Sequence, residues 1–346
     1  MTRASACCVP LGGTVDRMTR VGLVLGAGGL VGQAYHAGAL AALEHDLGWD
    51  PRTAEVIVGS SAGSLTGTAL RLGVPASDLA AWAVEAPLSP EGAPVLDAFG
   101  DEPPDLPPFD ARNLLRRWRL PARSLVLRTA RRPWAFRPSV AALTLLPAGH
   151  VDITGHADLL EGVIPDEWPE GLWICAARRN DGGRVVFGRE GSPEAPLTRA
   201  VAASCAIPGY FAPVRINGVT YFDGGVHSPT NADVLVRTGL DLVVVVSPMS
   251  AARGRALTPD AAMRWSAHNR LEREVRRLRA AGTEVVRIEP GRRALAAMGI
   301  NAMAGDRAER VVQAAFLDTG RHIAMGHAAE GLAALATRPS RRRPAA

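Results

Sequence analysis

The strongest constraint on the fold is a Gly-x-Ser-x-Gly pentapeptide at residues 59–63, directly after the short β-branched run Val56–Val58. A strand, this pentapeptide and then a segment able to continue as a helix form the pattern of a nucleophile elbow. The tight turn forces the hydroxyl of Ser61 outward, and the flanking glycines permit strained backbone and close packing of the helix. The pattern predicts an α/β fold and favours a hydrolase with Ser61 as nucleophile.

The rest of the chain alternates between strand-like and helix-like segments. Strands are expected at residues 20–25, 55–58, 172–177, 185–188, 214–216, 219–221, 241–247 and 283–288. Helices are expected from about 29 to 45, from 62 to about 85, at 197–205, at 260–281 and from about 306. The run at 241–247 is continuously apolar, as in strands buried on both faces of a parallel sheet. This alternation predicts a three-layer α/β/α sandwich with a mostly parallel central sheet.

A chain of 346 residues is long enough for one large α/β domain, which we expect at residues 20–330. A variable cap or insert is expected at 86–170, where prolines and acids cluster up to residue 108 in a surface excursion. Residues 1–19 are expected to form a disordered extension, with Met18 as a candidate start, and 331–346 a flexible arginine-rich tail. There is no apolar run of about 18 residues and no secretory h-region, so a cytoplasmic protein is expected.

All 39 basic residues are arginines, and they are unevenly spread. Residues 111–138 carry nine of them and no acid, and the tail from Arg338 carries four more, so the rest of the chain is net negative although the whole is +5. Arginines beside tryptophan at 111–138 suit peripheral docking on an anionic membrane. The alternative is a solvated cap whose arginines pair with the acids of 91–110. Nucleic-acid binding is the least favoured interpretation.

The four cysteines have neither metal-binding nor disulfide-framework spacing, which favours reduced thiols in the cytoplasm. Lipidation of the adjacent Cys7 and Cys8 is a minor alternative. Cys205 is expected to pack near the site rather than act as a second nucleophile.

The glycine cluster formed by Gly26, Ala27, Gly28 and Gly29 lies between the first strand and a helix N-terminus. Free amides and the helix dipole at such a position favour negative charge, so these residues are candidate donors to the oxyanion formed by attack on an ester. A dinucleotide-binding loop is the rival interpretation. It disagrees with the spacing, because Val31 stands where the third glycine belongs and the second strand ends without a ribose-binding acid.

A serine hydroxyl needs a base before it becomes a good nucleophile. Asp223 follows a strand and precedes two glycines, so its carboxylate would lie at the strand end. Among the histidines after Ser61, His227 has the best setting for a Ser–Asp–His triad because it closely follows Asp223. The histidines after Ser61 are His150, His156, His227, His268, His322 and His327.

Four motifs, at residues 26–29, 59–63, 204–208 and 223–225, occur in this order and together resemble the patatin-like phospholipases. The resemblance is strong from about Val21 to Leu235 and looser to about His327. It implies a three-layer α/β/α fold and hydrolysis of acyl lipids through a Ser–Asp dyad, with no catalytic histidine, no metal and no other cofactor.

Carried over by position, the resemblance makes Ser61 the nucleophile and Asp223 the base that takes its proton. The amides around Gly28 and Gly29 would form the oxyanion hole, and water would release the acyl group from Ser61. An aspartate with the ordinary pKa of about 3.9 is a weak base, so the dyad requires a partly desolvated Asp223. One departure is Val31, where the family often carries arginine or lysine. Two alternatives stay open: a catalytically weak lipid- or acyl-binding protein of this fold, and a soluble esterase with a triad through His227.

Three other features have simpler interpretations. Asp181-Gly182-Gly183 repeats the tripeptide of residues 223–225 but lies between two hairpin strands, so a turn is expected. His36, one turn into the first helix, is expected to be packed or hydrogen-bonded. The alternating Glu and Arg of residues 271–279 lie at intrahelical pairing distance and require only a solvated face.

Overall fold

The computed structural model describes residues 19–99, 149, 151–154, 167–252, 254, 259–325, 331, 333 and 335. The arginine-rich segment 111–138 and the cysteines Cys7 and Cys8 lie outside the described residues. The predictions made for them stay predictions.

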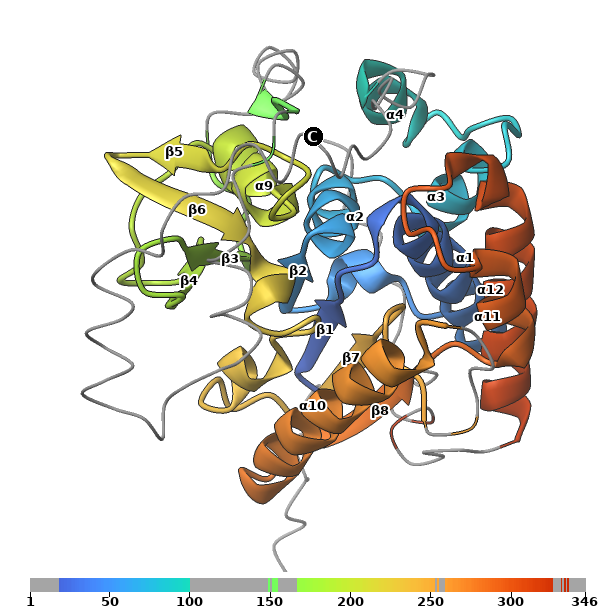
Figure 1. The fold of residues 1–346 in the computed structure, drawn as a ribbon. Helices are drawn as coiled ribbons and strands as arrows, with labels where there is room; N and C mark the ends of the chain where they lie inside the picture. The colour runs from blue at the N-terminus through green and yellow to red at the C-terminus, as the bar shows by residue number, and fades with distance from the viewer. Residues whose placement is uncertain are drawn as a thin grey trace, which may run out of the picture.

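The centre of the described structure is one mixed sheet of eight strands (Figure 1). The strands are β1 (Val21–Leu25), β2 (Val56–Ser60), β3 (Leu172–Arg178), β4 (Arg184–Phe187), β5 (Val214–Ile216), β6 (Val219–Asp223), β7 (Leu242–Val246) and β8 (Glu284–Ile288). Their order is β5-β6-β3-β2-β1-β7-β8, with β4 also paired to β3. Neighbours are parallel from β3 through β2, β1 and β7 to β8, whereas β4 and β6 pair antiparallel with β3, and β5 with β6. The mostly parallel central sheet is confirmed, and both predicted hairpins are present.

Helices cover both faces of this sheet (Figure 1). The α-helices with described bounds are α1 (Gly29–Leu47), α2 (Ala62–Arg71), α3 (Ala76–Trp82), α4 (Ala93–Phe99), α9 (Leu197–Cys205), α10 (Ala261–Ala280), α11 (Arg292–Met298) and α12 (Ala308–Ala324). Short 3-10 helices are η1 (Pro51–Thr53), η3 (Gly224–Val226), η4 (Ala232–Leu235) and η5 (Gly305–Arg307). The predicted three-layer α/β/α sandwich is therefore confirmed.

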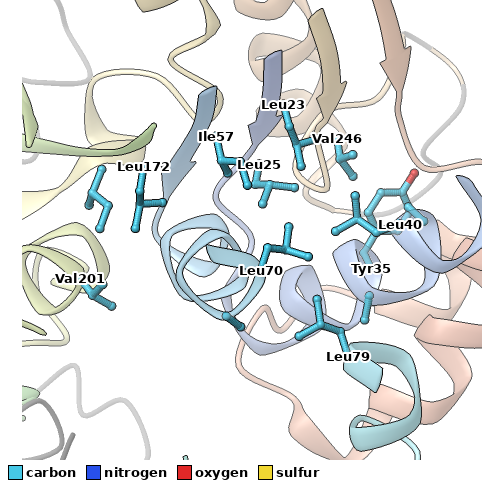
Figure 2. Close-up of a cluster of buried hydrophobic side chains, with 14 of the residues drawn as sticks. Leu23, Leu25, Tyr35, Leu40, Ile57, Leu70, Leu79, Leu172, Val201 and Val246 are labelled. Carbon is cyan, nitrogen blue, oxygen red and sulfur yellow. The ribbon is translucent and has the colours of Figure 1, made fainter. Parts of the chain in front are cut away.

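Alternation along β1 explains why two helical layers are needed. Leu23 and Leu25 join the larger core cluster, which includes side chains of α1, α2, α9 and α12 (Figure 2). Val24 points to the opposite face and packs in a second cluster with Leu271 and Val275 of α10. Successive side chains on a strand point to opposite faces, so a strand that is apolar throughout must be covered on both sides.

Two segments differ from the expectation. The region 86–108 was expected to be a surface excursion, but it contains α4, whose Leu96 is buried in the larger core cluster. Helix α11, with Ala294, Leu295 and Met298 buried, was not predicted. Both helices are seven residues long, too short for helical periodicity to stand out from the surrounding prolines, glycines and charges.

The domain also extends beyond the predicted boundary at residue 330. Gly331, Ala333 and Leu335 are helical, and the side chain of Leu335 is fully buried. At least the start of the predicted flexible tail therefore belongs to the core. No helix among the described residues is both long enough and apolar enough to span a bilayer.

We expect Leu335→Ala to lower the free energy of unfolding by about 2–5 kcal/mol, because it removes a buried side chain and leaves a cavity. Leu317→Ala on α12 is the matched control, since Leu317 is 52% exposed, and its effect should stay within about 0.5 kcal/mol. Urea denaturation of both variants measures the difference. Equal, small effects would contradict the packing of the C-terminal segment into the core.

Candidate active site

The elbow at Ser61 has the predicted strand–turn–helix arrangement. Strand β2 ends at Ser60, helix α2 begins at Ala62, and Ser61 between them has φ 53° and ψ −123°. A positive φ is uncommon for a residue with a side chain and is found where surrounding structure holds the backbone in place. Leu25 pairs with Gly59 in the parallel register of β1 and β2, so the chain leaves both strands at the same edge of the sheet.

Close packing explains the two glycines of the pentapeptide. A Cβ on Gly63 would lie 2.0 Å from the carbonyl oxygen of Leu25, and one on Gly59 would lie 2.6 Å from the carbonyl oxygen of Gly63. Both contacts are with backbone atoms, which cannot rotate away. The absence of side chains at these positions lets α2 begin directly against the end of β1.

Hydrogen bonds hold the backbone of Ser61 from two sides. Its amide donates to Oγ of Ser204 at 2.9 Å, and that hydroxyl donates in turn to the carbonyl oxygen of Cys175 at 2.7 Å. On the helix side, Oγ of Ser64 donates to the carbonyl oxygen of Ser61 at 2.7 Å. Ser204 lies in a motif that the sequence singled out, but its bond to the Ser61 amide was not predicted.

Strand register brings Asp223 to the same place. Ser60 on β2 pairs with Cys175 on β3, and the next residue of β3, Ala176, pairs with Asp223 on β6. The residue after Asp223 packs closely against β3, since a Cβ on Gly224 would lie 2.2 Å from the carbonyl oxygen of Cys175. Ser60 and Asp223 therefore pair with consecutive residues of β3, which places Asp223 at the elbow.

The Asp223 carboxyl is buried, with 5% of the residue exposed. Burial raises its pKa to about 6, while hydrogen bonding from the Ser61 side chain and the Gly225 amide acts in the opposite direction. The Gly225 amide donates to Oδ1 at 2.6 Å. The site thus combines a strained, buried serine with a desolvated carboxyl group that its hydroxyl contacts.

The glycine cluster lies next to this pair, but only part of it can donate to an oxyanion. The Gly26 amide donates to the carbonyl oxygen of Val246 at 3.0 Å, and the Ala27 amide to that of Pro229 at 2.7 Å. The prediction was therefore wrong for the amides of Gly26 and Ala27.

The amides of Gly28 and Gly29 are the remaining candidates. Neither donates a hydrogen bond to another described residue. Gly28 is the N-cap of α1 and Gly29, with φ 62°, is its first residue, where backbone amides lack intrahelical acceptors. A Cβ on Gly225 would lie 3.0 Å from Cβ of Ala27, so the cluster adjoins the turn after Asp223. Val31 occupies the position where the family often carries arginine or lysine. Its side chain is buried, and its amide donates to the carbonyl oxygen of Ala302.

The described histidines take part in other interactions. Nδ1 of His227 lies 3.2 Å from Oδ1 of Asn231, and Nδ1 of His268 lies 2.8 Å from Oε1 of Glu289. His36 is fully buried with Nδ1 3.3 Å from Oγ1 of Thr66, and burial lowers its pKa to about 3. The prediction that His36 is a packed, hydrogen-bonded residue is confirmed. His322 lies on α12, and His150, His156 and His327 lie outside the described residues.

Two further predictions are confirmed, one beside the site and one in the turn between β3 and β4. Cys205 is buried with Sγ 3.7 Å from Oγ of Ser64, and burial, followed by the charge of Asp223, raises its pKa to about 12. Such a thiol stays protonated and inert at neutral pH. Asp181 forms a turn, in which its carboxylate accepts from the Gly183 amide and pairs with Arg178.

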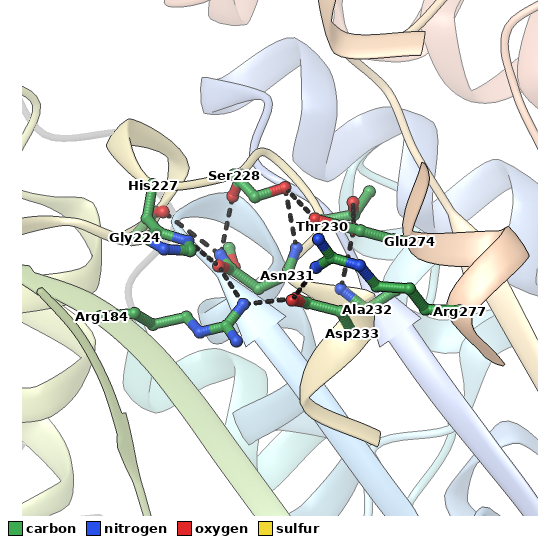
Figure 3. Close-up of polar contacts among 11 residues, drawn as sticks. Arg184, Gly224, His227, Ser228, Thr230, Asn231, Ala232, Asp233, Glu274 and Arg277 are labelled. Atoms are coloured by element: carbon green, nitrogen blue, oxygen red, sulfur yellow. Dashed lines mark hydrogen bonds and ion pairs between the residues drawn. The ribbon is translucent and has the colours of Figure 1, made fainter. Parts of the chain in front are cut away.

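The prediction of a purely solvated face for residues 271–279 was wrong at Glu274. This carboxylate is buried on α10 and accepts from Oγ of Ser228 at 2.6 Å, Oγ1 of Thr230 at 2.6 Å and the Ala232 amide at 3.0 Å (Figure 3). Residues 271, 274, 275 and 278 form one helical stripe, so Glu274 occupies a core-facing position. That spacing was the signal available in the sequence.

Comparison with known proteins is consistent with these motifs. A family model described as patatin-like phospholipase matches residues 23–236. The chain belongs to this family.

The curated relatives and solved structures that resemble this chain share little of its sequence. Uncharacterized NTE family proteins of Mycobacterium bovis and Mycobacterium tuberculosis are 30% identical over 146 residues, which cover 42% of this chain and 38% of theirs. The crystal structure of VipD from Legionella pneumophila is 13% identical, with a TM-score of 0.39, over 88% of this chain and 67% of that one. The type III effector protein ExoU is 17% identical, with a TM-score of 0.37, over 92% and 54%.

We expect Gly63→Ala to lower the free energy of unfolding by roughly 1–3 kcal/mol, because its Cβ would overlap the Leu25 carbonyl and force backbone to move. Gly305→Ala is the control, since its Cβ would meet only a methyl group of Leu30 at 3.4 Å. Thermal unfolding compares the two. If both variants melt together with the parent, the packing explanation for the second glycine of the pentapeptide fails.

Proposed function

We propose that this patatin-like protein hydrolyses carboxylic ester bonds of acyl lipids, with Ser61 as nucleophile and Asp223 as its base. The observation that carries the proposal is the contact between the strained Ser61 and a buried carboxyl whose pKa is raised to about 6. Family membership supports a lipid acyl ester as the substrate class.

In the proposed reaction, Asp223 accepts the proton of the Ser61 hydroxyl as Oγ attacks the ester carbonyl carbon. The negative charge moves to the carbonyl oxygen, where the amides of Gly28 and Gly29 donate to it. The ester C–O bond then breaks, and the leaving alcohol takes the proton from Asp223. Water, deprotonated by the same carboxylate, attacks the carbonyl carbon of the acyl-enzyme. The bond between that carbon and Ser61 Oγ then breaks, Asp223 returns the proton to Oγ, and the fatty acid leaves.

Burial gives Asp223 the basicity that this scheme needs. A pKa of about 6 makes it a stronger base than an aspartate in water, at about 3.9, yet it remains ionised at neutral pH. This is the balance that general-base catalysis favours, because a base works best when its pKa lies near the working pH. Peripheral membrane contact through residues 111–138 remains a separate prediction.

A fluorophosphonate probe tests the nucleophile, because it reacts covalently with activated serines. The parent should be labelled at Ser61, as mapped by mass spectrometry, Ser61→Ala should not be labelled, and Asp223→Asn should react on the order of 10²-fold or more slowly. Lipid esters then identify the substrate. A folded parent that binds lipid but neither reacts with the probe nor turns over would favour the lipid-binding alternative.

The pH dependence tests the base. We expect kcat/KM for a soluble ester to rise about tenfold per pH unit below about pH 6 and to level off above it, because only ionised Asp223 accepts a proton. His227→Ala should leave this profile in place. A midpoint near 3.9 would contradict the desolvated carboxyl. If kcat/KM fell by several orders of magnitude in His227→Ala, the mechanism would be a Ser–Asp–His triad instead of a dyad.

A further inference from the structure

The segment that follows Asp223 contacts the glycine cluster, the elbow at Ser61 and the turn after Asp223. The carbonyl oxygen of Pro229 accepts from the Ala27 amide at 2.7 Å, in the glycine cluster. Nδ2 of Asn231 donates to Oγ of Ser60 at 2.9 Å, beside the nucleophile, and to the carbonyl oxygen of Gly224 at 3.2 Å, beside the base. One short stretch of chain therefore connects the glycine cluster, the elbow and the turn after Asp223.

Asn231 is built into this position. It is fully buried and has φ 53° and ψ 25°, a left-handed conformation that asparagine tolerates better than most residues. Nδ2 also donates to the carbonyl oxygen of Ser228 at 2.7 Å, and Oδ1 accepts from the Arg184 guanidinium at 3.2 Å. Carbonyl oxygens only accept and a guanidinium only donates, so the orientation of the carboxamide is fixed. An aspartate here would set a carboxylate oxygen against two carbonyl oxygens.

Further polar contacts anchor the segment around Asn231 (Figure 3). Arg184 on β4 also pairs with Asp233 at 2.5 Å, and Arg277 on α10 pairs with the other oxygen of Asp233 at 3.1 Å. Glu274 on the same helix accepts three hydrogen bonds from residues 228–232. The stretch that carries Asn231 is thus anchored to both a strand and a helix.

We propose that Asn231 is a positioning residue of the site. Its carboxamide ties Ser60, which precedes the nucleophile, to Gly224, which follows the base, and so holds Ser61 and Asp223 at a fixed separation. These two side chains come from strands that do not pair with each other, since β2 and β6 each pair with a different part of β3. This inference rests on the proposed Ser–Asp reaction, whose rate depends on that separation because misplacement by about 1 Å can cost 10²-fold.

The test compares Asn231→Gly and Asn231→Asp with the parent. Glycine keeps the left-handed backbone and removes the carboxamide, while aspartate keeps the shape and removes the donor. The same changes at Asn217 are the matched control, because Asn217 has φ 48°, lies in an exposed turn and donates Nδ2 to the carbonyl oxygen of Glu194. The readouts are the rate constant of fluorophosphonate labelling, and kcat and KM for a soluble ester. The value of kcat is corrected for the fraction of Ser61 that labels at completion.

For Asn231→Gly we expect kcat and the labelling rate to fall on the order of 10²-fold, with a much smaller change in KM. The pH midpoint should move below about 6, because loosened packing admits water to Asp223. Asn231→Asp should be equally impaired, and both Asn217 variants should match the parent. If Asn231 acts through Ser60, Ser60→Ala combined with Asn231→Gly should be no slower than Asn231→Gly alone.

A purely structural role predicts a different result: a lower melting temperature, with kcat per labelled site and the pH midpoint unchanged. That result, or full activity in Asn231→Gly, would overturn the proposal. If the parent itself never labels at Ser61, the proposed function fails separately. Crystal structures of the parent and Asn231→Gly then decide the positioning claim: a longer distance from Ser61 Oγ to the Asp223 carboxylate supports it, and an unchanged distance overturns it.

Discussion

The register of three neighbouring strands is the constraint on which the candidate site depends. Ser60 pairs with Cys175 across β2 and β3, and Ala176 pairs with Asp223 across β3 and β6. A shift of one residue in either pairing would turn the affected side chains to the opposite face of the sheet. Ser61 and Asp223 lie 162 positions apart in the numbering, yet the register of β2, β3 and β6 brings them together.

The same burial that raises the pKa of Asp223 also has a cost in stability. Its pKa is raised in the fold, so the folded state favours the protonated carboxyl, and ionisation destabilises the fold as the pH rises from the unfolded pKa through about 6. At neutral pH the protein carries the full cost of that buried charge, on the order of 3 kcal/mol for a shift of about two pKa units. The surrounding core, with β1, β2 and β7 buried along their whole length, offsets this cost.

The sequence was sufficient where the signal is local. The strand, pentapeptide and helix predicted the position of Ser61, and a strand end followed by two glycines singled out Asp223, whose role as base came from the resemblance to the patatin-like phospholipases. It was insufficient where partners come from distant segments. Nothing in the sequence near Gly26 and Ala27 reveals that their amides donate to carbonyl oxygens of β7 and Pro229. These two hydrogen bonds remove half of the predicted oxyanion donors. Leu96 and Leu335 were missed for the same reason, because they lie in short apolar runs whose packing partners come from distant segments of the chain.

Glu274 and Asn231 show how buried polar groups can specify a site without touching the reacting atoms. Glu274 faces only uncharged donors, two hydroxyls and one amide, so it organises the chain around it without supplying a partner to the arginines. Arg184 and Arg277 instead form ion pairs with Asp233. The carboxamide of Asn231 can then meet carbonyl oxygens on one side and Arg184 on the other without carrying a charge itself. Any charged side chain at this position would leave one side mismatched, and a buried mismatch costs more than a lost hydrogen bond. The neutrality of Asn231 therefore lets the buried network of Arg184, Asp233 and Glu274 reach Ser60 and Gly224 through a side chain that adds no charge of its own next to Asp223.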